Sequence, residues 1–401
     1  MTGSLAENSA FLWISVFLCS MGYAMSLTED IKALALEAGF HAVGITSAEP
    51  FAEAEHALRE RYERGLLEGS GYDLETIRLY THPRESLLAA RSLISVALSY
   101  LNDEADFGFP PRGRMARFSR GLDYHRVLHE RLLVLAGDIR AKLGRRVEIR
   151  PFADTGPLVD RSAAIRAGIG SRGKNTCVYV GEYQSWVVLG ELLTDLDLEP
   201  DAAAPADICG ECTECMKACP TGAICAPYTV DVKLCLSQVT QSKGFIPREF
   251  REKLGARIYG CDTCQSACPL NRDAKAGNID EFRPYRGLGS EPELLPLLNM
   301  SVGDFKRRVA PTTAGWIGRA KFRRNAAVAL GNIGDPLAIP GLTEALSDPE
   351  PVIRGHAAWA LGRIGTPPAR FALEAARSRE TDHQAAEEIR EALDRAGSRS
   401  E

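Results

Sequence analysis

The chain has 401 residues, of which 45% are hydrophobic and 25% charged, a composition ordinary for a globular protein. This length is enough for two or three domains with a full hydrophobic core. The formal net charge of −5 gives no global reason to expect nucleic-acid binding. Any such site would have to be a local basic patch.

The N-terminal 25 residues contain an apolar run over 11–19, which is too short to span a membrane as a helix. The run resembles the hydrophobic part of a signal peptide, but no Lys or Arg precedes it. Met21 and Met25 follow it, and a helical pattern starts directly afterwards. We therefore expect residues 1–25 to be an extension from a mis-set translation start, and the protein to be cytoplasmic without stable membrane association.

Residues 26–205 show a mixed pattern of helices and strands. Apolar periodicity predicts helices over 31–38, 52–63 and 125–143, and short apolar runs predict strands over 42–45, 92–97 and 185–189. This pattern indicates an α/β or α+β domain, which ends at a stretch rich in Asp, Ala and Pro over 199–205.

Three motifs in this domain allow two interpretations each. Asp154 precedes Thr-Gly-Pro and a helical run over 162–167, so it is either an N-terminal helix cap or a proton donor whose pKa burial would raise. The glycine-rich stretch 168–176 is either a simple turn or a close approach to a bulky ligand. The basic and aromatic stretch 112–125 is either a solvated face or a ligand-facing loop.

The cysteines of residues 206–280 carry the strongest chemical signal. One run has the spacing C-x2-C-x2-C-x3-C-P, which is the bacterial ferredoxin signature for a [4Fe–4S] cluster, and a second run follows. Exchange of the fourth cysteines predicts one cluster on Cys209, Cys212, Cys215 and Cys268, and another on Cys219, Cys235, Cys261 and Cys264. Structural zinc would favour two isolated C-x2-C pairs, and disulfides seldom use such tight runs. The sequence therefore predicts a domain with two [4Fe–4S] clusters.

Residues 281–395 contain an internal repeat. The segments 324–334 and 355–365 align with a period of about 31 residues and share the pattern Ala-Ala-x-Ala-Leu-Gly, which is typical of HEAT-like helical repeats. A basic segment leads into the first repeat. Its seven cations are Lys306, Arg307, Arg308, Arg319, Lys321, Arg323 and Arg324. They form either a phosphate-binding patch or the charged edge of the repeat.

The joint order of these motifs resembles that of epoxyqueuosine reductases. The resemblance rests on Asp154-Thr-Gly-Pro, Ala167-Gly-Ile-Gly with Gly173-Lys-Asn-Thr, both cysteine runs, and the Ala358-Trp-Ala-Leu-Gly repeat. It implies a fold of class α+β, with a cobalamin-binding domain, a ferredoxin-like domain and a helical domain that binds tRNA. It also implies removal of the epoxide oxygen from epoxyqueuosine at the tRNA wobble position, with cobalamin and two [4Fe–4S] clusters as cofactors.

The resemblance further implies roles for single residues. Asp154 matches the proton donor near the cobalt. The residues that it places in contact with cobalamin are Arg117, Asp154, Ser237, Asp262, Thr263 and Gln265. The basic approach to the repeats corresponds to the tRNA-binding side. The resemblance also implies that an unidentified electron donor reduces the protein and that the protein is a monomer.

Two other functions remain open from the sequence. A reductive dehalogenase-like enzyme that acts on a small molecule would keep the clusters and the cobalamin but would not need a basic tail with repeats. A ferredoxin-like electron carrier would need no cobalamin. This chain also departs from the usual pattern of the family at His82, at Asp160-Arg161 and around Gln238.

Overall fold

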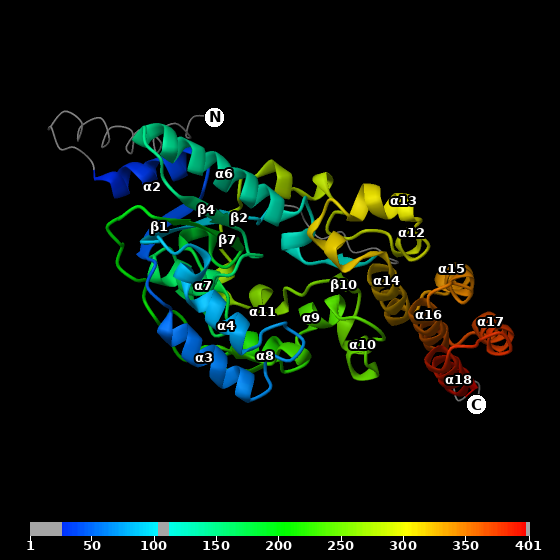
Figure 1. Ribbon diagram of the computed structural model, residues 1–401. Coiled ribbons are helices and arrows are strands. Elements are labelled where there is room, and N and C mark those ends of the chain that lie inside the picture. Colours follow the sequence, from blue (N-terminus) through cyan, green and yellow to red (C-terminus); the bar gives the residue numbers. More distant parts are fainter. Residues whose placement is uncertain (1–25, 103–111, 398–401) are drawn as a thin grey trace, which may run out of the picture.

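The computed structural model describes residues 26–102 and 112–397 (Figure 1). The extension predicted over 1–25 lies outside the described residues. The N-terminal part is built on one four-stranded sheet with the order β1-β2-β7-β4. Its strands are β1 (Ala42–Ser47), β2 (Ser92–Ser99), β7 (Val187–Thr194) and β4 (Ile149–Phe152). All neighbouring strands run antiparallel, so the domain is α+β rather than α/β.

Helices cover both faces of this sheet, which is why every residue of β2 is buried. Helices α2 (Leu27–Glu37) and α6 (Tyr124–Leu143) pack on one side, and α7 (Asp160–Arg166) contacts β2 and β7 from the other (Figure 1). Farther out on that side lie α3 (Ala52–Glu63) and α4 (Leu74–Thr81), and the short α5 (Pro83–Ser86) packs against α4. The predicted helix over 52–63 is confirmed to the residue.

The cysteine segment folds into short elements, because its backbone must turn repeatedly around the thiols. Its helices and strands are α8 (Glu214–Ala218), β8 (Ile224–Ala226), β9 (Thr229–Val230), α9 (Leu236–Gln241), α10 (Arg248–Leu254), β10 (Arg257–Tyr259) and α11 (Thr263–Ser266). Strand β10 pairs in parallel with β3 (Arg114–Met115), and this pairing joins the cysteine segment to the N-terminal domain. A second small ladder, between β5 (Ser171–Arg172) and β6 (Val178–Tyr179), follows α7.

The C-terminal part is helical, as the repeat predicts. Helices α14 (Arg319–Ile333), α16 (Pro351–Ile364) and α18 (His383–Gly397) stack in a row, with α15 (Ile339–Ala345) and α17 (Pro367–Arg377) outside them (Figure 1). Before them come α12 (Leu294–Leu298), α13 (Val302–Asp304) and the π-helical turn η7 (Phe305–Val309). Short 3₁₀ turns complete the chain: η1 (Arg117–Ser119), η2 (Gly181–Tyr183), η3 (Val232–Leu234), η4 (Pro269–Asn271), η5 (Asp280–Phe282), η6 (Pro284–Arg286), η8 (Thr313–Ile317) and η9 (Pro336–Ala338).

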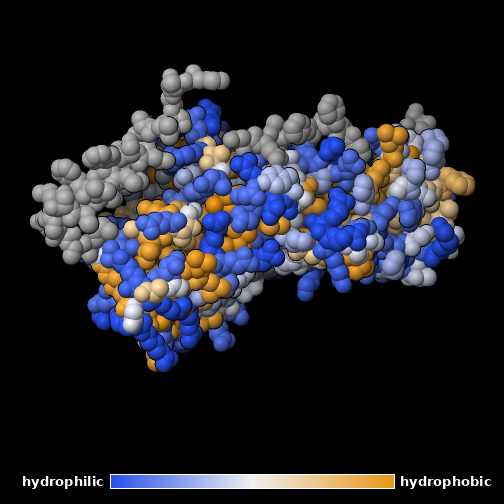
Figure 2. Space-filling model, turned by 90° about the horizontal axis from the view of Figure 1, so that it is seen from above, coloured by the Kyte–Doolittle hydropathy of each residue, from blue (hydrophilic) through white to orange (hydrophobic). Residues whose placement is uncertain are grey.

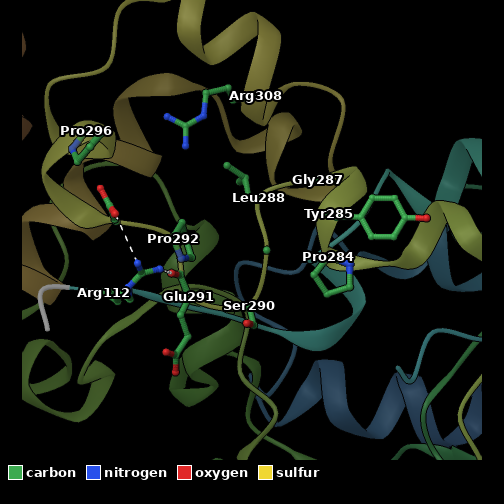
Figure 3. A pocket seen from close by; sticks show the side chains of 12 residues that line it. Arg112, Pro284, Tyr285, Gly287, Leu288, Ser290, Glu291, Pro292, Pro296 and Arg308 are labelled. Carbon is green, nitrogen blue, oxygen red and sulfur yellow. Dashed lines mark hydrogen bonds and ion pairs between the residues drawn. The ribbon is translucent and has the colours of Figure 1, made fainter. Parts of the chain in front are cut away.

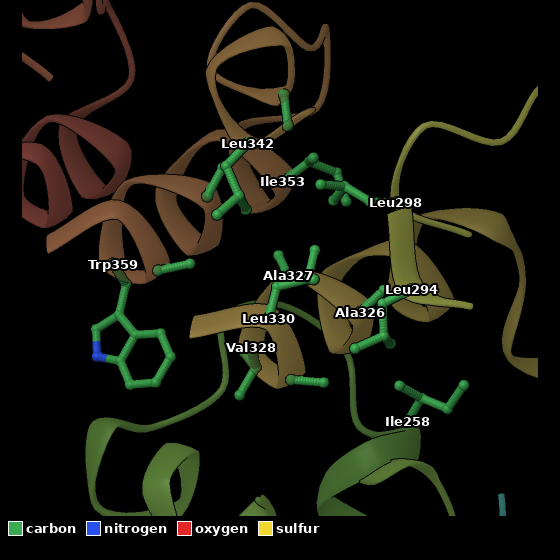
Figure 4. Packing of buried hydrophobic residues seen from close by; sticks show 14 of the residues in the cluster. Ile258, Leu294, Leu298, Ala326, Ala327, Val328, Leu330, Leu342, Ile353 and Trp359 are labelled. Carbon is green, nitrogen blue, oxygen red and sulfur yellow. The ribbon is translucent and has the colours of Figure 1, made fainter. Parts of the chain in front are cut away.

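The repeated Leu-Gly pair explains how closely the stacked helices pack. A Cβ atom on Gly331 would lie 2.7 Å from the Trp359 ring, and one on Gly362 would lie 2.7 Å from Ala392. Only glycine fits at such a contact. Figure 4 shows Leu330 and Trp359 at this junction.

One hydrophobic core joins the repeats to the cysteine segment. It contains Leu236, Ile258 and Phe322 together with Trp359 and Leu361, so the repeats dock on the cysteine segment. Removal of the repeats would therefore expose the core of the cysteine segment.

Two of the seven cations predicted to bind tRNA belong to this core. Arg323 is 5% exposed, forms an ion pair of 2.5 Å with Asp348 and donates a hydrogen bond to the Leu298 carbonyl. Arg324 is 0% exposed and donates to the carbonyls of Ser242 and Gly244 at 2.8 and 2.6 Å. Because neither guanidinium group can reach a phosphate, the prediction that Arg323 and Arg324 bind tRNA is wrong.

We expect Arg324→Ala to destabilise the protein by at least ~2 kcal/mol, since the carbonyl groups after α9 would lose a buried, charged donor. Chemical denaturation under anaerobic conditions measures the effect. Arg307→Ala is the matched control, because Arg307 is exposed and pairs with its near neighbour Asp304. Equal unfolding free energies for the two variants would contradict the structural role of Arg324.

Among residues 26–102 and 112–397, no helix combines the length and apolar character needed to cross a membrane. The face shown in Figure 2 mixes hydrophilic and hydrophobic side chains.

Candidate active site

Helix α6 begins at the site and sets the position of two side chains in it. Asp123 is the helix cap, and its Oδ1 atom accepts a hydrogen bond from the backbone N–H of His125. The same oxygen lies 2.7 Å from Nδ1 of His125, so the cap also fixes the imidazole ring. Tyr124 stacks on this ring with a centroid distance of 4.0 Å.

Asp154 meets these two side chains from a loop after β4. Its Oδ2 atom accepts a short hydrogen bond from the Tyr124 hydroxyl and lies 3.3 Å from Nε2 of His125. The residue has a positive φ of 59°, a conformation that Asp tolerates better than most residues. Helix α7 begins only at Asp160, so the interpretation of Asp154 as a helix cap is wrong.

The electrostatics of this group place a proton on His125. Burial alone would lower the pKa of His125, but hydrogen bonds to Asp123 and Asp154 raise it to about 9. Burial acts to raise the pKa of Asp154, yet the hydrogen bonds from His125 and Tyr124 bring it below its ordinary value. The Asp154 side chain is also 52% exposed. The expected rise in its pKa is therefore absent, and the group at rest is an ionised Asp154 beside an imidazolium.

This arrangement makes part of the stability depend on pH. The pKa of His125 is raised from 6.5 to about 9, so its contribution is complete below pH 6.5 and disappears as the pH passes about 9. We expect the difference in unfolding free energy between wild type and His125→Gln to follow this course. Denaturation curves across the pH range measure it, and a difference that does not change with pH would contradict the assigned imidazolium.

The cysteine runs face each other across a cavity of about 290 Å³. Its lining includes all four cysteines assigned to the second cluster, Cys219, Cys235, Cys261 and Cys264. Cys215 lies within electrostatic range of Cys209 and Cys268, which are assigned with it to the first cluster, and also of Cys264. In the part of the chain that the structure describes, no three Cys, His, Asp or Glu side chains converge as a single metal ion would require. The gathering of four thiols around one cavity fits a cluster, and the exact pairing of the eight cysteines stays a prediction.

The glycine-rich stretch 168–176 serves the first cysteine loop. The backbone N–H of Lys174 donates to Sγ of Cys209 at 3.4 Å, and its ammonium group binds the carbonyls of Gly210 and Cys212. Asn175 and Thr176 then reach the cavity beside the second set of cysteines. The stretch is thus more than a simple turn.

The residues predicted to contact cobalamin fall into two groups. Ser237 and Thr263 line the cavity, together with Arg161. Asp262 lies behind them, where Oδ2 accepts a hydrogen bond of 2.7 Å from the backbone N–H of Arg117. The Arg117 guanidinium group lies 5.2 Å from the centre of the Trp186 ring.

Gln265 lies deeper than these residues. It is 9% exposed, and its amide donates to the Tyr100 hydroxyl and to the Ser185 carbonyl at 3.1 and 2.8 Å. This network leaves its amide nitrogen occupied by protein groups. These hydrogen bonds hold the second cysteine run in place.

Sequence reasoning missed three residues of this region. Tyr124 and His125 were not named as site residues, although Asp-Tyr-His at the start of a predicted helix is a signal for a capped, oriented pair. Cys177 was left unassigned, yet its thiol contacts Cys264. Its single occurrence far from both runs offers no signal.

Known protein families match this chain in the same order as its structural parts. Family models match the chain over 81–155 for epoxyqueuosine reductase (QueG, DUF1730), over 208–271 for a 4Fe-4S double cluster binding domain, and over 318–394 for HEAT repeats. The epoxyqueuosine reductases of Bacillus anthracis and Bacillus subtilis are each 39% identical over 373 residues. These alignments cover 92% of this chain and 97% and 95% of the two relatives. The chain belongs to the epoxyqueuosine reductase family.

Solved structures of the family share the whole fold. An epoxyqueuosine reductase with an epoxyqueuosine-modified tRNA-Tyr stem loop has a TM-score of 0.87 and 38% identity, over 92% of this chain and 99% of that one. Another, from Bacillus subtilis, has a catalytic aspartate loop swung out of the active site, with a TM-score of 0.85 and 38% identity over 92% and 98% of the chains. The predicted α+β fold with a two-cluster domain and helical repeats is confirmed.

Proposed function

We propose that this protein removes the epoxide oxygen from epoxyqueuosine in tRNA and leaves the alkene of queuosine. The epoxide takes up two electrons and two protons, both C–O bonds break, and the oxygen leaves as water. The observation that carries the proposal is the full-length similarity to epoxyqueuosine reductases together with an intact set of cluster cysteines and Asp154.

Two [4Fe–4S] clusters and cobalamin are the cofactors of the family, and the residues here fit them. Bound cobalamin supplies a low-potential centre that can deliver electrons to the substrate. Ser237 and Thr263 would hold it from the cavity, with Arg117, Asp262 and Gln265 as the further proposed contacts. Arg161 lines the cavity and acts electrostatically on Asp154, so the cavity and the acid group adjoin.

The side chains around Asp154 would supply protons to the substrate oxygen. His125 holds a proton within 3.3 Å of Asp154, and the Tyr124 hydroxyl donates to the same oxygen. When an anionic oxygen develops on the substrate, a proton passed through Asp154 would neutralise it.

Each of the three parts of the chain would bind a different cofactor or substrate. Residues 26–205 would bind cobalamin, 206–280 would hold the clusters and 281–395 would bind tRNA. Within the last part, Lys306, Arg307 and Arg308 are exposed on η7, and Arg319 and Lys321 are half-buried. Trp316 beside them is 64% exposed, with the Lys321 ammonium group 5.3 Å from its ring centre. Exposed aromatic and cationic side chains together suit a nucleic acid with unpaired bases.

A cavity of about 620 Å³ lies at the edge of this basic segment. Figure 3 shows Arg308 above it and the Tyr285 ring at one side. Arg112 and Glu293, which form an ion pair, also line the cavity. We propose that the phosphates of the tRNA stem loop pass along this edge and contact Arg308.

We expect Lys306→Ala, Arg307→Ala and Arg308→Ala combined to weaken binding of the tRNA stem loop and to reduce its salt dependence. Each lost phosphate contact lowers the slope of log affinity against log salt by about 0.7 to 0.9. Gel-shift titrations at several salt concentrations measure the slope. The control is Arg377→Ala, which removes one cation from the end of α17. An unchanged slope in the triple variant would contradict this tRNA surface.

Three accompanying properties belong to the proposal. We infer that an external one-electron donor reduces the clusters and that the protein acts as a monomer. Because [4Fe–4S] clusters are sensitive to oxygen, we also infer a reducing cytoplasm as its location.

The test offers the reconstituted protein two substrates under strong reductant, an epoxyqueuosine-modified stem loop and a halogenated phenol. We expect the modified nucleoside to lose one oxygen and the phenol to keep its halogen. Halide release without a change in the nucleoside would favour the dehalogenase-like alternative and overturn the proposal. Truncation before the repeats is unsuitable as a test, because it would open the shared core.

A further inference from the structure

A pair of buried carboxyl groups lies behind Asp154 and is not used in the mechanism above. Glu191 stands in the middle of β7, opposite Ser95 of β2 and Phe152 of β4, and is 0% exposed. Asp160 is the first residue of α7, which packs against β2 and β7. The two carboxyl groups lie close enough for each to shift the pKa of the other.

The hydrogen bonds around this pair leave two oxygens without donors. The Ser95 hydroxyl lies 3.5 Å from Oε1 of Glu191, while Oε2 of Glu191 and Oδ1 of Asp160 are buried and have no partner among the described residues. Two carboxylates can only accept, so contact between them would be repulsive. A proton bound between them turns one group into a donor, which resolves both the repulsion and the missing partners.

The charges that face the pair favour retention of protons. Burial, followed by the charge of Asp154, raises the pKa of Asp160 to about 7, and the smaller effects of the neighbouring Glu191 and of Arg161 oppose this rise. Burial and the charge of Asp160 raise the pKa of Glu191 well above its ordinary value. The pair therefore titrates as a unit, with one firmly held proton and one that exchanges near neutral pH.

We propose that Asp160 and Glu191 form a proton reserve that resupplies Asp154 during turnover. This inference rests on the proposed function, because epoxide removal consumes two protons while Asp154 can deliver one at a time. After the first transfer, the exchangeable proton of the pair moves to the ionised Asp154, which then protonates the oxygen again to release water. Asp160 and Glu191 do not touch the substrate themselves, and they act on the reaction only through Asp154.

The pH profile of the single-turnover rate tests this proposal. In wild type we expect a fall in rate as the pH rises through about 7, where Asp160 loses its proton. Asp160→Asn should abolish this limb, and Glu191→Gln should move it to lower pH, because a glutamine amide can donate to the Asp160 carboxylate. The control is Glu182→Gln, an exposed carboxyl group paired with Lys275, which should keep the wild-type profile. Variant profiles that superimpose on wild type after scaling would show a merely structural pair and overturn the proposal.

A second measurement does not depend on activity. Infrared difference spectra of the wild-type holoprotein should show a protonated carboxyl band that titrates near neutral pH and is absent from Asp160→Asn. No conversion by wild type together with this band would overturn the proposed function but keep the shared proton. Absence of the band from wild type would overturn the proton reserve even if the protein is fully active.

Discussion

Asp154→Asn is expected to lower the single-turnover rate of epoxide reduction by about 10²- to 10⁴-fold, the usual contribution of a positioned acid–base group. Asparagine has nearly the same shape, and its carbonyl oxygen can still accept the hydrogen bonds from Tyr124 and His125. It cannot carry a proton to the substrate oxygen. The rate of queuosine formation, measured by rapid quench with prereduced protein, reports this loss.

The control for this variant is its own cofactor content. Iron per chain and cobalamin absorbance should equal those of wild type, because Asp154 lies in a half-exposed loop outside the hydrophobic cores. A variant with full cofactor content and a rate close to wild type would remove Asp154 from the proposed proton path.

Cys235→Ala is expected to abolish activity and to lower the iron content by half, because it removes one ligand of the second cluster. Two clusters contain eight irons, so about four should remain per chain. Cys235 lines the cavity with the three other cysteines of its set, which makes loss of the whole cluster the expected outcome. Iron analysis and electron paramagnetic resonance of the reduced protein measure it.

The matched control is Cys225→Ala, because Cys225 is exposed and its thiol contacts the Thr229 carbonyl rather than the cavity. It should retain about eight irons and full activity. Cys268→Ala tests the exchange of fourth cysteines, since it should leave the same resonance signal as Cys209→Ala. Loss of the signal of the Cys235 cluster instead would contradict the pairing.

The local chemistry of this fold could be predicted well from the sequence. Strict spacing of the cysteines leaves few alternatives, and the periodicity over 52–63 matches a helix to the residue. The extent of strand β7 was harder to predict. Its predicted run ended at Leu189, whereas β7 continues through Gly190 and Glu191 to Thr194. In a sequence, a charged residue normally marks the end of a predicted buried strand. Glu191 is nevertheless buried, and its contact with Asp160 explains why.

The direction of long side chains could not be predicted. Arg324 looks like part of a basic patch in the sequence, but the helix phase turns it toward the carbonyls after α9. The alignment of the two repeats contained a partial sign of this docking. Asn325 corresponds to His356, and both are fully buried and bind backbone atoms of the cysteine segment. A polar residue at the same core position of two repeats indicates docking rather than a solvent-exposed face.

The pKa of Asp154 also depends on contacts between distant segments. The sequence supports a buried acid with a raised pKa, but helix α6 brings His125 and Tyr124 to its carboxylate. The raised pKa values belong instead to Asp160 and Glu191, one layer deeper. Tertiary contacts thus lower the pKa of Asp154 and raise the pKa values of the two carboxyl groups near it.

The most direct measurement of the central claim is a single turnover without external reductant. Holoprotein is reduced, freed of reductant and mixed with an epoxyqueuosine-modified tRNA stem loop, and the nucleosides are identified by mass spectrometry. The account predicts one queuosine for every two electrons stored in the protein, and none from the oxidised protein. Oxidation of the clusters without any loss of oxygen from the nucleoside would contradict it.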